Sequence, residues 1–252
     1  MLKLNAITED GVVEAVEWNR EILREIEQRE TGAEYDEEAG KLHRDQGCLL
    51  YALEKPEAAR GHLGEAARRL SRALVGRARP EPSTHRSAWE AEQFLNIIAT
   101  FGTAEDVARL EALQPWQCRA PERAGQEALA GYLAALADHL LGRGVNEEAL
   151  AGWRAECERA KAGKEERLFL TSSIRGLLAV RAGNEEEMNF ALARILAAHK
   201  REAQKGDLKL LAQGMVSFRA LMLARMGAEA GLECRAVSEY LPLELLEGGG
   251  EG

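Results

Sequence analysis

The residue composition is the feature that most constrains how this chain can fold. Its 252 residues include 42 alanines and 35 leucines, but only 16 valines and isoleucines together. Alanine, leucine, glutamate and arginine lose little side-chain freedom in a helix, whereas β-branched residues lose more. Only six prolines interrupt the chain. We therefore predict an all-α protein, long enough to bury a large core.

The spacing of apolar residues predicts where several helices lie. The first helix is expected over residues 10–29. Its apolar face is expected to consist of Ala15, Trp18, Ile22 and Ile26. Residues 30–36 contain a glycine and are expected to form a loop. Near the end of the chain, an aspartate is expected to cap a helix over residues 207–226.

Turn and cap signals recur along the chain and predict antiparallel helical hairpins. They lie near Pro56, Thr103, Asn146, Asn184 and Gly227, at intervals of 47, 43, 38 and 43 residues. These intervals are close to the period of helical-hairpin repeats, in which each hairpin buries its apolar face against its neighbours. Because the intervals drift, we predict an irregular stack of hairpins, either TPR-like or an α-solenoid-like bundle.

The domain organisation is predicted to be simple. Residues 1–246 are expected to form a single all-helical domain. The clearest break is the stretch 79–83, which contains two prolines and therefore disfavours helix. It could divide an N-terminal unit from the rest, but that unit is small, and we interpret the stretch as a loop within one domain. Residues 247–252 are rich in glycine and are expected to form a flexible tail.

The charge of the chain argues against some partners. The formal net charge is −9, and residues 1–40 hold twelve carboxylates against four basic groups. General nucleic-acid binding depends on lysine and arginine that neutralise phosphates, so we expect none. An acidic protein is instead suited to remain soluble or to attract a basic partner.

The cysteines and the N-terminus indicate the compartment. The four cysteines lie far apart and form no CxxC motif: Cys48, Cys118, Cys157 and Cys234. This pattern is typical of free thiols in a reducing compartment. The N-terminus lacks an apolar signal stretch, and no uncharged run approaches the roughly 20 residues that span a bilayer. We therefore expect a cytoplasmic protein that does not insert into membranes.

The sequence shows no motif of an assembled catalytic or metal site. None of the five histidines completes an ExxH or HxxxH pattern, no GxSxG occurs, and no glycine-rich phosphate loop is present. Each histidine is interpreted as a surface or capping residue. We predict no catalytic residue, no metal and no cofactor, and hence no enzyme.

Two polar groups of residues stand out from this background. Glu34, Asp36, Glu37 and Glu38 form a dense acidic cluster. Carboxylates there would favour the positive end of a helix, or they could meet a basic protein surface. The second group, residues 171–173, is a run of three hydroxyl residues inside an apolar helix. These hydroxyls are expected to bond back to the preceding turn, with a polar pocket as the alternative.

The C-terminal region carries a resemblance to a known family. Residues 220–246 read ALMLARMGAEAGLECRAVSEYLPLELL, in which a helix ends at Gly227 or Gly231 and a short extended link follows. The arrangement resembles the C-terminus of the immunity protein 49 family, thought to protect bacteria against polymorphic toxins. The motif positions are interpreted as structural, with no catalytic role: Tyr240, Leu241, Pro242 and Leu245.

The resemblance implies a function and a partner. The protein is expected to neutralise a cognate bacterial toxin by stoichiometric binding, and the acidic cluster is the candidate contact. A basic toxin such as a nuclease would suit the net charge of −9. Two alternatives remain: a TPR-like helical scaffold or adaptor that binds a peptide or protein, and a helical enzyme with a site assembled from distant residues.

Overall fold

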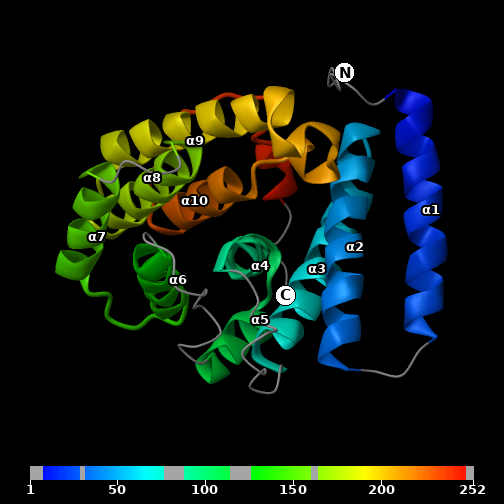
Figure 1. Ribbon diagram of the computed structural model, residues 1–252, viewed down its shortest axis with the longest axis horizontal. Coiled ribbons are helices and arrows are strands. Elements are labelled where there is room, and N and C mark those ends of the chain that lie inside the picture. Colours follow the sequence, from blue (N-terminus) through cyan, green and yellow to red (C-terminus); the bar gives the residue numbers. More distant parts are fainter. Residues whose placement is uncertain (1–7, 29–31, 77–87, 114–125, 160–163, 248–252) are drawn as a thin grey trace.

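The computed structural model describes residues 8–28, 32–76, 88–113, 126–159 and 164–247. These residues form helices and connecting segments without a β-strand, which confirms the predicted all-α fold (Figure 1). The α-helices are α1 (Glu9–Glu27), α2 (Ala33–Ala52), α3 (Pro56–Gly76), α4 (Ala88–Phe101), α5 (Ala104–Ala108), α6 (Gln126–Leu140), α7 (Glu147–Arg159), α8 (Lys164–Arg181), α9 (Glu185–Lys205) and α10 (Phe218–Glu229). The short 3-10 helices are η1 (Arg109–Ala112), η3 (Asp207–Leu210), η4 (Ala212–Met215) and η5 (Leu243–Leu245).

Consecutive helices pair along the chain, as expected for a stack of hairpins. α1, α2 and α3 lie side by side at one edge of the molecule, and α7, α8 and α9 lie at the opposite side (Figure 1). α4 and α6 pack together between these two groups. α10 lies inside this arrangement, in contact with α4, α8 and α9 (Figure 1).

Four helices end in the same kind of turn. Three of the turns contain a glycine with positive φ: Gly142, Gly183 and Gly231. The fourth, after α2, places Glu54 at φ 58°. In each turn the next amide donates to the carbonyl five residues earlier, as Asn184 N does to Ala179 O at 2.8 Å. This Schellman-type end satisfies carbonyls that a helix terminus leaves free, and it reverses the chain between hairpin arms.

Three of the helix N-caps that the sequence predicts are confirmed. Each side chain accepts a hydrogen bond from the amide three residues further on: Thr103 from Asp106, Asn146 from Ala149 and Asn184 from Glu187. At Thr103 the Asp106 carboxylate also accepts from the Thr103 amide, completing a capping box. These local bonds help to set where α5, α7 and α9 begin.

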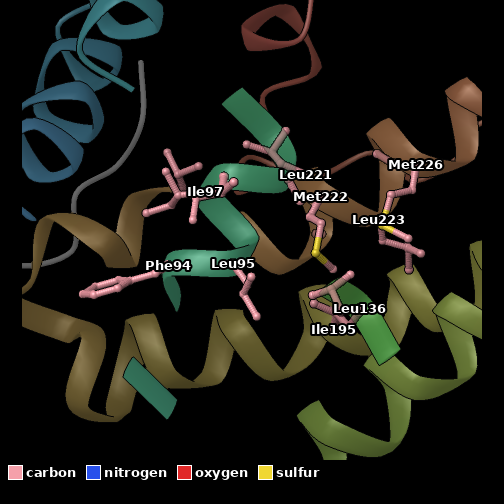
Figure 2. Packing of buried hydrophobic residues seen from close by; sticks show 14 of the residues in the cluster. Phe94, Leu95, Ile97, Leu136, Ile195, Leu221, Met222, Leu223 and Met226 are labelled. Atoms are coloured by element: carbon pink, nitrogen blue, oxygen red, sulfur yellow. The ribbon is translucent and has the colours of Figure 1, made fainter. Parts of the chain in front are cut away.

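α10 is the central helix of the core and is buried on nearly every side. Leu221, Met222, Leu223 and Met226 of α10 lie among Leu95 and Ile97 of α4, Leu136 of α6 and Ile195 of α9 (Figure 2). Apolar residues occupy most of the circumference of α10, which suits a helix in a protein interior. Small residues let its neighbours approach closely: a Cβ on Gly176 of α8 would lie 2.4 Å from Leu223 Cδ2.

α2 and α3 are packed equally closely at the edge of the molecule. A Cβ on Gly40 would lie 2.7 Å from Leu70, and one on Gly47 would lie 2.6 Å from Leu63. The two glycines are seven residues apart, or about two helical turns, so they lie on one face of α2. This face lets α3 approach to a distance that larger side chains would prevent.

The segment after α10 returns across the body of the protein and is held by side chains of α9. The Asn189 amide donates to Glu233 O at 2.8 Å, and its oxygen accepts from Arg235 N at 2.7 Å. Glu185 adds an acceptor for the Glu233 amide at 3.0 Å. The Asn189 side chain therefore provides both a donor and an acceptor for the backbone of this segment, as the backbone of a neighbouring strand would in a sheet.

One predicted helix face is wrong. Val12, Val16, Leu23 and Ile26 form the buried stripe of α1, whereas Trp18 is 63 % exposed. Successive helical residues are about 100° apart, which places Trp18 roughly 120° from the centre of that stripe. The predicted stripe through Trp18 also has helical spacing, but α2 packs against the stripe that begins at Val12.

Two predicted boundaries also differ from the structure. Residues 33–36 belong to α2 and not to a loop, because carboxylates in its first turn favour the positive helix end. The predicted helix over 207–226 is broken, since α9 ends at Lys205 and α10 begins at Phe218. Between them Gly214 packs so closely on Leu208 that a Cβ would lie 2.3 Å from the Leu208 carbonyl oxygen. This tertiary contact requires two short turns where spacing alone predicted one helix.

Buried apolar residues from α1 to η5 join one main cluster, which extends from Val12 to Leu245. A smaller cluster of Leu23, Ile26 and Ala39 lies between α1 and α2. The single domain over 1–246 stays a prediction. The predicted break at 79–83 and residues 248–252 of the predicted tail lie outside the described residues.

Candidate functional site

The four carboxylates predicted to bind a partner separate into two kinds. Asp36 accepts a hydrogen bond from Arg69 Nη1 at 2.9 Å, which ties α2 to α3. Glu37 is buried and accepts from Lys41 Nζ at 2.8 Å within α2. Glu34 and Glu38 are exposed. Only the latter two therefore present most of their surface to a partner at the start of α2.

A buried ion pair joins α4 to α10. Arg219 Nε donates to Glu92 Oε1 at 2.6 Å, and Arg219 Nη2 donates to Glu92 Oε2 at 2.5 Å. The carboxylate is fully buried. The guanidinium carbon also lies 4.4 Å from the centroid of the Phe169 ring. Two parallel charge-assisted bonds and an aromatic face give this pair a defined geometry.

Hydroxyl groups of α6 and α8 adjoin the ion pair. Burial raises the pKa of Tyr132, and the nearby Glu92 carboxylate raises it further. The neighbouring Ser173 side chain lowers the pKa of Tyr132, although the two hydroxyls do not reach full hydrogen-bond geometry. Tyr132 therefore stays protonated near neutral pH, and groups from α4, α6, α8 and α10 meet in one buried polar centre: Glu92, Tyr132, Ser173 and Arg219.

The expectation for residues 171–173 is confirmed for only one of them. Thr171 Oγ1 donates to Leu168 O at 3.3 Å, as predicted for a hydroxyl in mid-helix. The hydroxyls of Ser172 and Ser173 are buried without a hydrogen-bond partner among the described residues. For Ser173 the reason is tertiary, because its side chain interacts with Tyr132 of a neighbouring helix.

Two histidines meet across the α2–α3 interface. His43 Nδ1 lies 2.9 Å from His62 Nδ1, so one ring donates to the other when both are neutral. Burial, followed by the charge that His62 can carry, lowers the pKa of His43 from 6.5 to about 4. The interpretation of His43 as a surface or capping residue is therefore wrong. The two residues are 19 apart in sequence, and only the hairpin brings them together.

A third histidine packs against the C-terminal motif. His199 of α9 is buried, its Nε2 lies 3.1 Å from Gly214 O, and burial lowers its pKa to about 4. Its ring contacts that of Tyr240 at a centroid distance of 5.2 Å. Tyr240 O in turn accepts from Ser217 N at 2.9 Å. Hence His199 too is wrongly interpreted as a surface residue.

The four motif residues of the C-terminus lie in the packed interior. Tyr240, Leu241, Pro242 and Leu245 are all buried. Pro242 immediately precedes η5, and Tyr51 of α2 donates to Glu244 Oε1 at 2.8 Å beside it. The C-terminal segment thus connects α9, the start of α10 and α2, and the structural role of the motif stays a prediction.

The described residues place few reactive groups together. Within them, no group of three His, Cys, Asp or Glu side chains is arranged to hold a metal ion. Burial raises the pKa of the Cys48 thiol, which keeps it in the unreactive protonated form. No described helix is long and apolar enough to cross a membrane. The polar centre and the histidine pair fit best as packing elements that align helices.

Sequence reasoning missed both of these groups, although one signal was available. Arg219 is a charged residue inside an otherwise apolar stretch, and an interior charge requires a partner, whereas Glu92 lies beside Glu90 and Gln93 and does not stand out. Glu92 and Arg219 are 127 residues apart, so the partner itself could not be named from spacing. The histidine pair offers no comparable signal in the sequence.

Comparison with known proteins gives the family of this chain. No curated protein and no solved structure matches it. The family model described as immunity protein 49 matches residues 50–245, which covers the chain from the end of α2 to η5. The buried polar centre, α10 and the C-terminal motif all lie within the matched part. On the strength of this match, the chain belongs to the immunity protein 49 family.

Proposed function

We propose that this protein neutralises a cognate bacterial toxin by stoichiometric binding and without catalysis of its own. The observation that carries the proposal is the family match over residues 50–245. The family name implies a toxin as the partner. A stable complex would bury about 1,200–2,000 Å² in total, which a rigid helical surface can supply at a low cost in ordering.

The proposed toxin carries a basic contact surface, as a nuclease would. The net charge of −9 supports this, because opposite charge accelerates encounter between two proteins. Glu34 and Glu38 at the start of α2 belong to the proposed contact region, whereas Asp36 and Glu37 support it from within. We further propose a cytoplasmic location, which is compatible with the free thiols of Cys48, Cys157 and Cys234.

The TPR-like adaptor is the weaker candidate. A repeat protein of that kind binds peptides in the concave face of its superhelix. Here α10 occupies the inside of the helical arrangement and is buried against α4, α8 and α9 (Figure 1). An inner face that is already filled by the chain's own helix offers little room for a peptide.

The test is co-purification with the toxin domain encoded immediately upstream of this gene, combined with rescue of growth during toxin expression. We expect a one-to-one complex and restored growth. Absence of both would contradict the proposed function for that pair. The double variant Glu34→Gln and Glu38→Gln should weaken the complex. The double variant Glu148→Gln and Glu186→Gln is the control, because it removes equal charge at the opposite side of the molecule. Equal effects of the two double variants would remove the start of α2 from the contact.

A further inference from the structure

The outermost helix carries a large apolar side chain on its solvent side. α1 packs against α2 through its buried stripe and forms the edge of the molecule (Figure 1). Trp18 lies on the opposite part of the helix and is 63 % exposed. Tryptophan is rarely left exposed by folding alone, because it is the side chain with the largest apolar surface.

Carboxylates lie along one flank of Trp18 on the solvent side of α1. Glu14 and Glu21 are four residues before it and three after it, which makes them its direct neighbours on a helix. Asp10 and Glu17 continue the row, and all four carboxylates are exposed. No lysine or arginine of the described residues forms an ion pair with any of them. We call these five residues the α1 outer face: Asp10, Glu14, Glu17, Trp18 and Glu21.

The carboxylates of the α1 outer face differ from three other carboxylates near the surface. Glu185, Glu187 and Glu147 lie near the surface too, but each pairs with an arginine. Like charges three or four residues apart weaken an isolated helix. The α1 outer face therefore combines an exposed aromatic ring with four carboxylates that form no ion pair with the described residues. Asp10 favours the helix start, but the exposed indole ring of Trp18 contributes little to folding.

We propose that the α1 outer face is the docking surface for the cognate toxin, with Trp18 as its central anchor. This inference rests on the proposed function and deepens it. The partner surface that fits has an apolar recess for the indole ring, bordered by lysine or arginine. Those cations pair with the carboxylates and lie against the ring face.

The position of α1 in the family match supports a role in choosing the partner. The matched region begins at residue 50, so all of α1 lies outside it. The matched part holds the buried centre and the C-terminal motif, which stabilise the fold. A helix outside that part can vary in its contacts without disturbing the core, which is what recognition of one particular toxin requires.

The first experiment measures binding kinetics of the full chain with the upstream-encoded toxin domain. Trp18→Ala should raise Kd by about 30-fold or more, mainly through faster dissociation, as expected for a central interface aromatic. Phe190→Ala is the matched control, because Phe190 is an exposed aromatic residue on the first turns of α9, away from α1. It should change Kd by less than about threefold. Circular dichroism and the melting temperature verify that both variants fold.

The second experiment separates charge from apolar contact. The double variant Glu14→Gln and Glu21→Gln should slow association by about 3- to 10-fold at low salt, with little change in dissociation. The difference should shrink toward zero at roughly 0.5 M salt. The double variant Glu148→Gln and Glu186→Gln is the control of equal charge and should leave association close to that of the unmodified protein.

The outcomes separate the docking surface from the function. If the unmodified protein binds and rescues growth but Trp18→Ala does the same with unchanged Kd, the docking surface is wrong and the proposed function stands. If Trp18→Ala loses affinity and Phe190→Ala does not, the inference is supported. If the unmodified protein neither binds nor rescues, the proposed function fails, and this inference fails with it.

Discussion

α1 and α10 are helices of the same protein with opposite surroundings. α1 buries one stripe against α2 and presents exposed carboxylates and Trp18 to solvent. α10 is enclosed by α4, α8 and α9, and its arginines are paired: Arg219 with Glu92 and Arg225 with Glu229. α10 lies within the region that the family model matches, whereas α1 lies outside it.

The comparison sets the helix that stabilises the fold apart from the helix that we propose binds the toxin. Among the described residues, each buried carboxylate or guanidinium has a partner of opposite charge, because an unpaired buried charge costs several kcal/mol. The four carboxylates of the α1 outer face form no ion pair with the described residues, and the cost of leaving them so is small because water screens their charge. Substitutions at the centre should therefore alter the free energy of unfolding, while those on the α1 outer face should alter binding alone.

The largest expected effect is at the buried ion pair. Arg219→Met leaves the Glu92 carboxylate buried without its partner and should lower the free energy of unfolding by about 3–5 kcal/mol. Glu21→Gln on α1 should change it by less than about 0.5 kcal/mol. Urea denaturation measures both. A cost below about 1 kcal/mol for Arg219→Met would contradict the central role of the pair, and adding Glu92→Met should recover part of the loss.

The next largest effect is a pH dependence of the free energy of unfolding. It tests whether His43 at the edge of the molecule and His199 near the C-terminal motif are buried alike. His43 and His199 each have a pKa of about 4 in the folded protein and an ordinary value of 6.5 when unfolded. As pH falls below 6.5 the unfolded chain takes up protons first, so stability declines until about pH 4. The loss at pH 5 should be roughly 2 kcal/mol for each histidine.

The control for this prediction compares the pH dependence of stability in each histidine variant with that of the unmodified protein. His43→Asn and His199→Asn should each make the loss between pH 7 and pH 5 smaller, whatever their stability at pH 7. The charged groups facing His43 are His62, Glu65, Arg68 and Arg69. An unchanged pH dependence in the His43 variant would show that its ring is not held neutral by the α2–α3 interface.

A third prediction uses glycines with opposite surroundings. Gly176 faces Leu223 of α10, and Gly176→Ala should cost about 1–3 kcal/mol through overpacking. Gly61 lies within α3 with no neighbour near its Cβ position, and Gly61→Ala should stabilise by about 0.5–1 kcal/mol. Thermal unfolding monitored at 222 nm reports both. If Gly176→Ala and Gly61→Ala changed the stability in the same direction, the close packing around α10 would be disproved.

The smallest expected effect concerns the turn after α2. Glu54 adopts φ 58°, where the three equivalent turns have glycine. Glu54→Gly should therefore stabilise the protein by about 1 kcal/mol, because glycine adopts the left-handed conformation without a steric cost. Gly183→Ala makes the reverse change in the turn after α8 and should destabilise by a similar amount. Loss of stability in both variants would mean that side-chain contacts of Glu54 outweigh its backbone strain.

Much of the helical pattern could be predicted from local chemistry. Thr103, Asn146 and Asn184 cap helices as their side chains suggest. The predictions failed where two local solutions were equally good. α1 has two apolar stripes of acceptable spacing, and packing against α2 selects the one without Trp18.

The candidate sites were less predictable than the helices. The acidic cluster at residues 34–38 was visible as a run of charge, but the pairing of Asp36 with Arg69 could not be seen in it. The 127 residues between Glu92 and Arg219 and the 19 between His43 and His62 hide both contacts in the same way. Each contact depends on which faces of two helices meet, whether the helices are consecutive, as α2 and α3 are, or far apart in sequence, as α4 and α10 are.

Local chemistry therefore decides that this chain is helical, where several of its helices begin, and that its N-terminal part is acidic. Helix propensity, caps and charge act over a few residues, so they can be read along the chain. The tertiary structure alone decides that α10 becomes the centre, that Arg219 is neutralised by Glu92, and that Trp18 remains at the surface. Those outcomes follow from burial, which depends on every neighbouring helix at once.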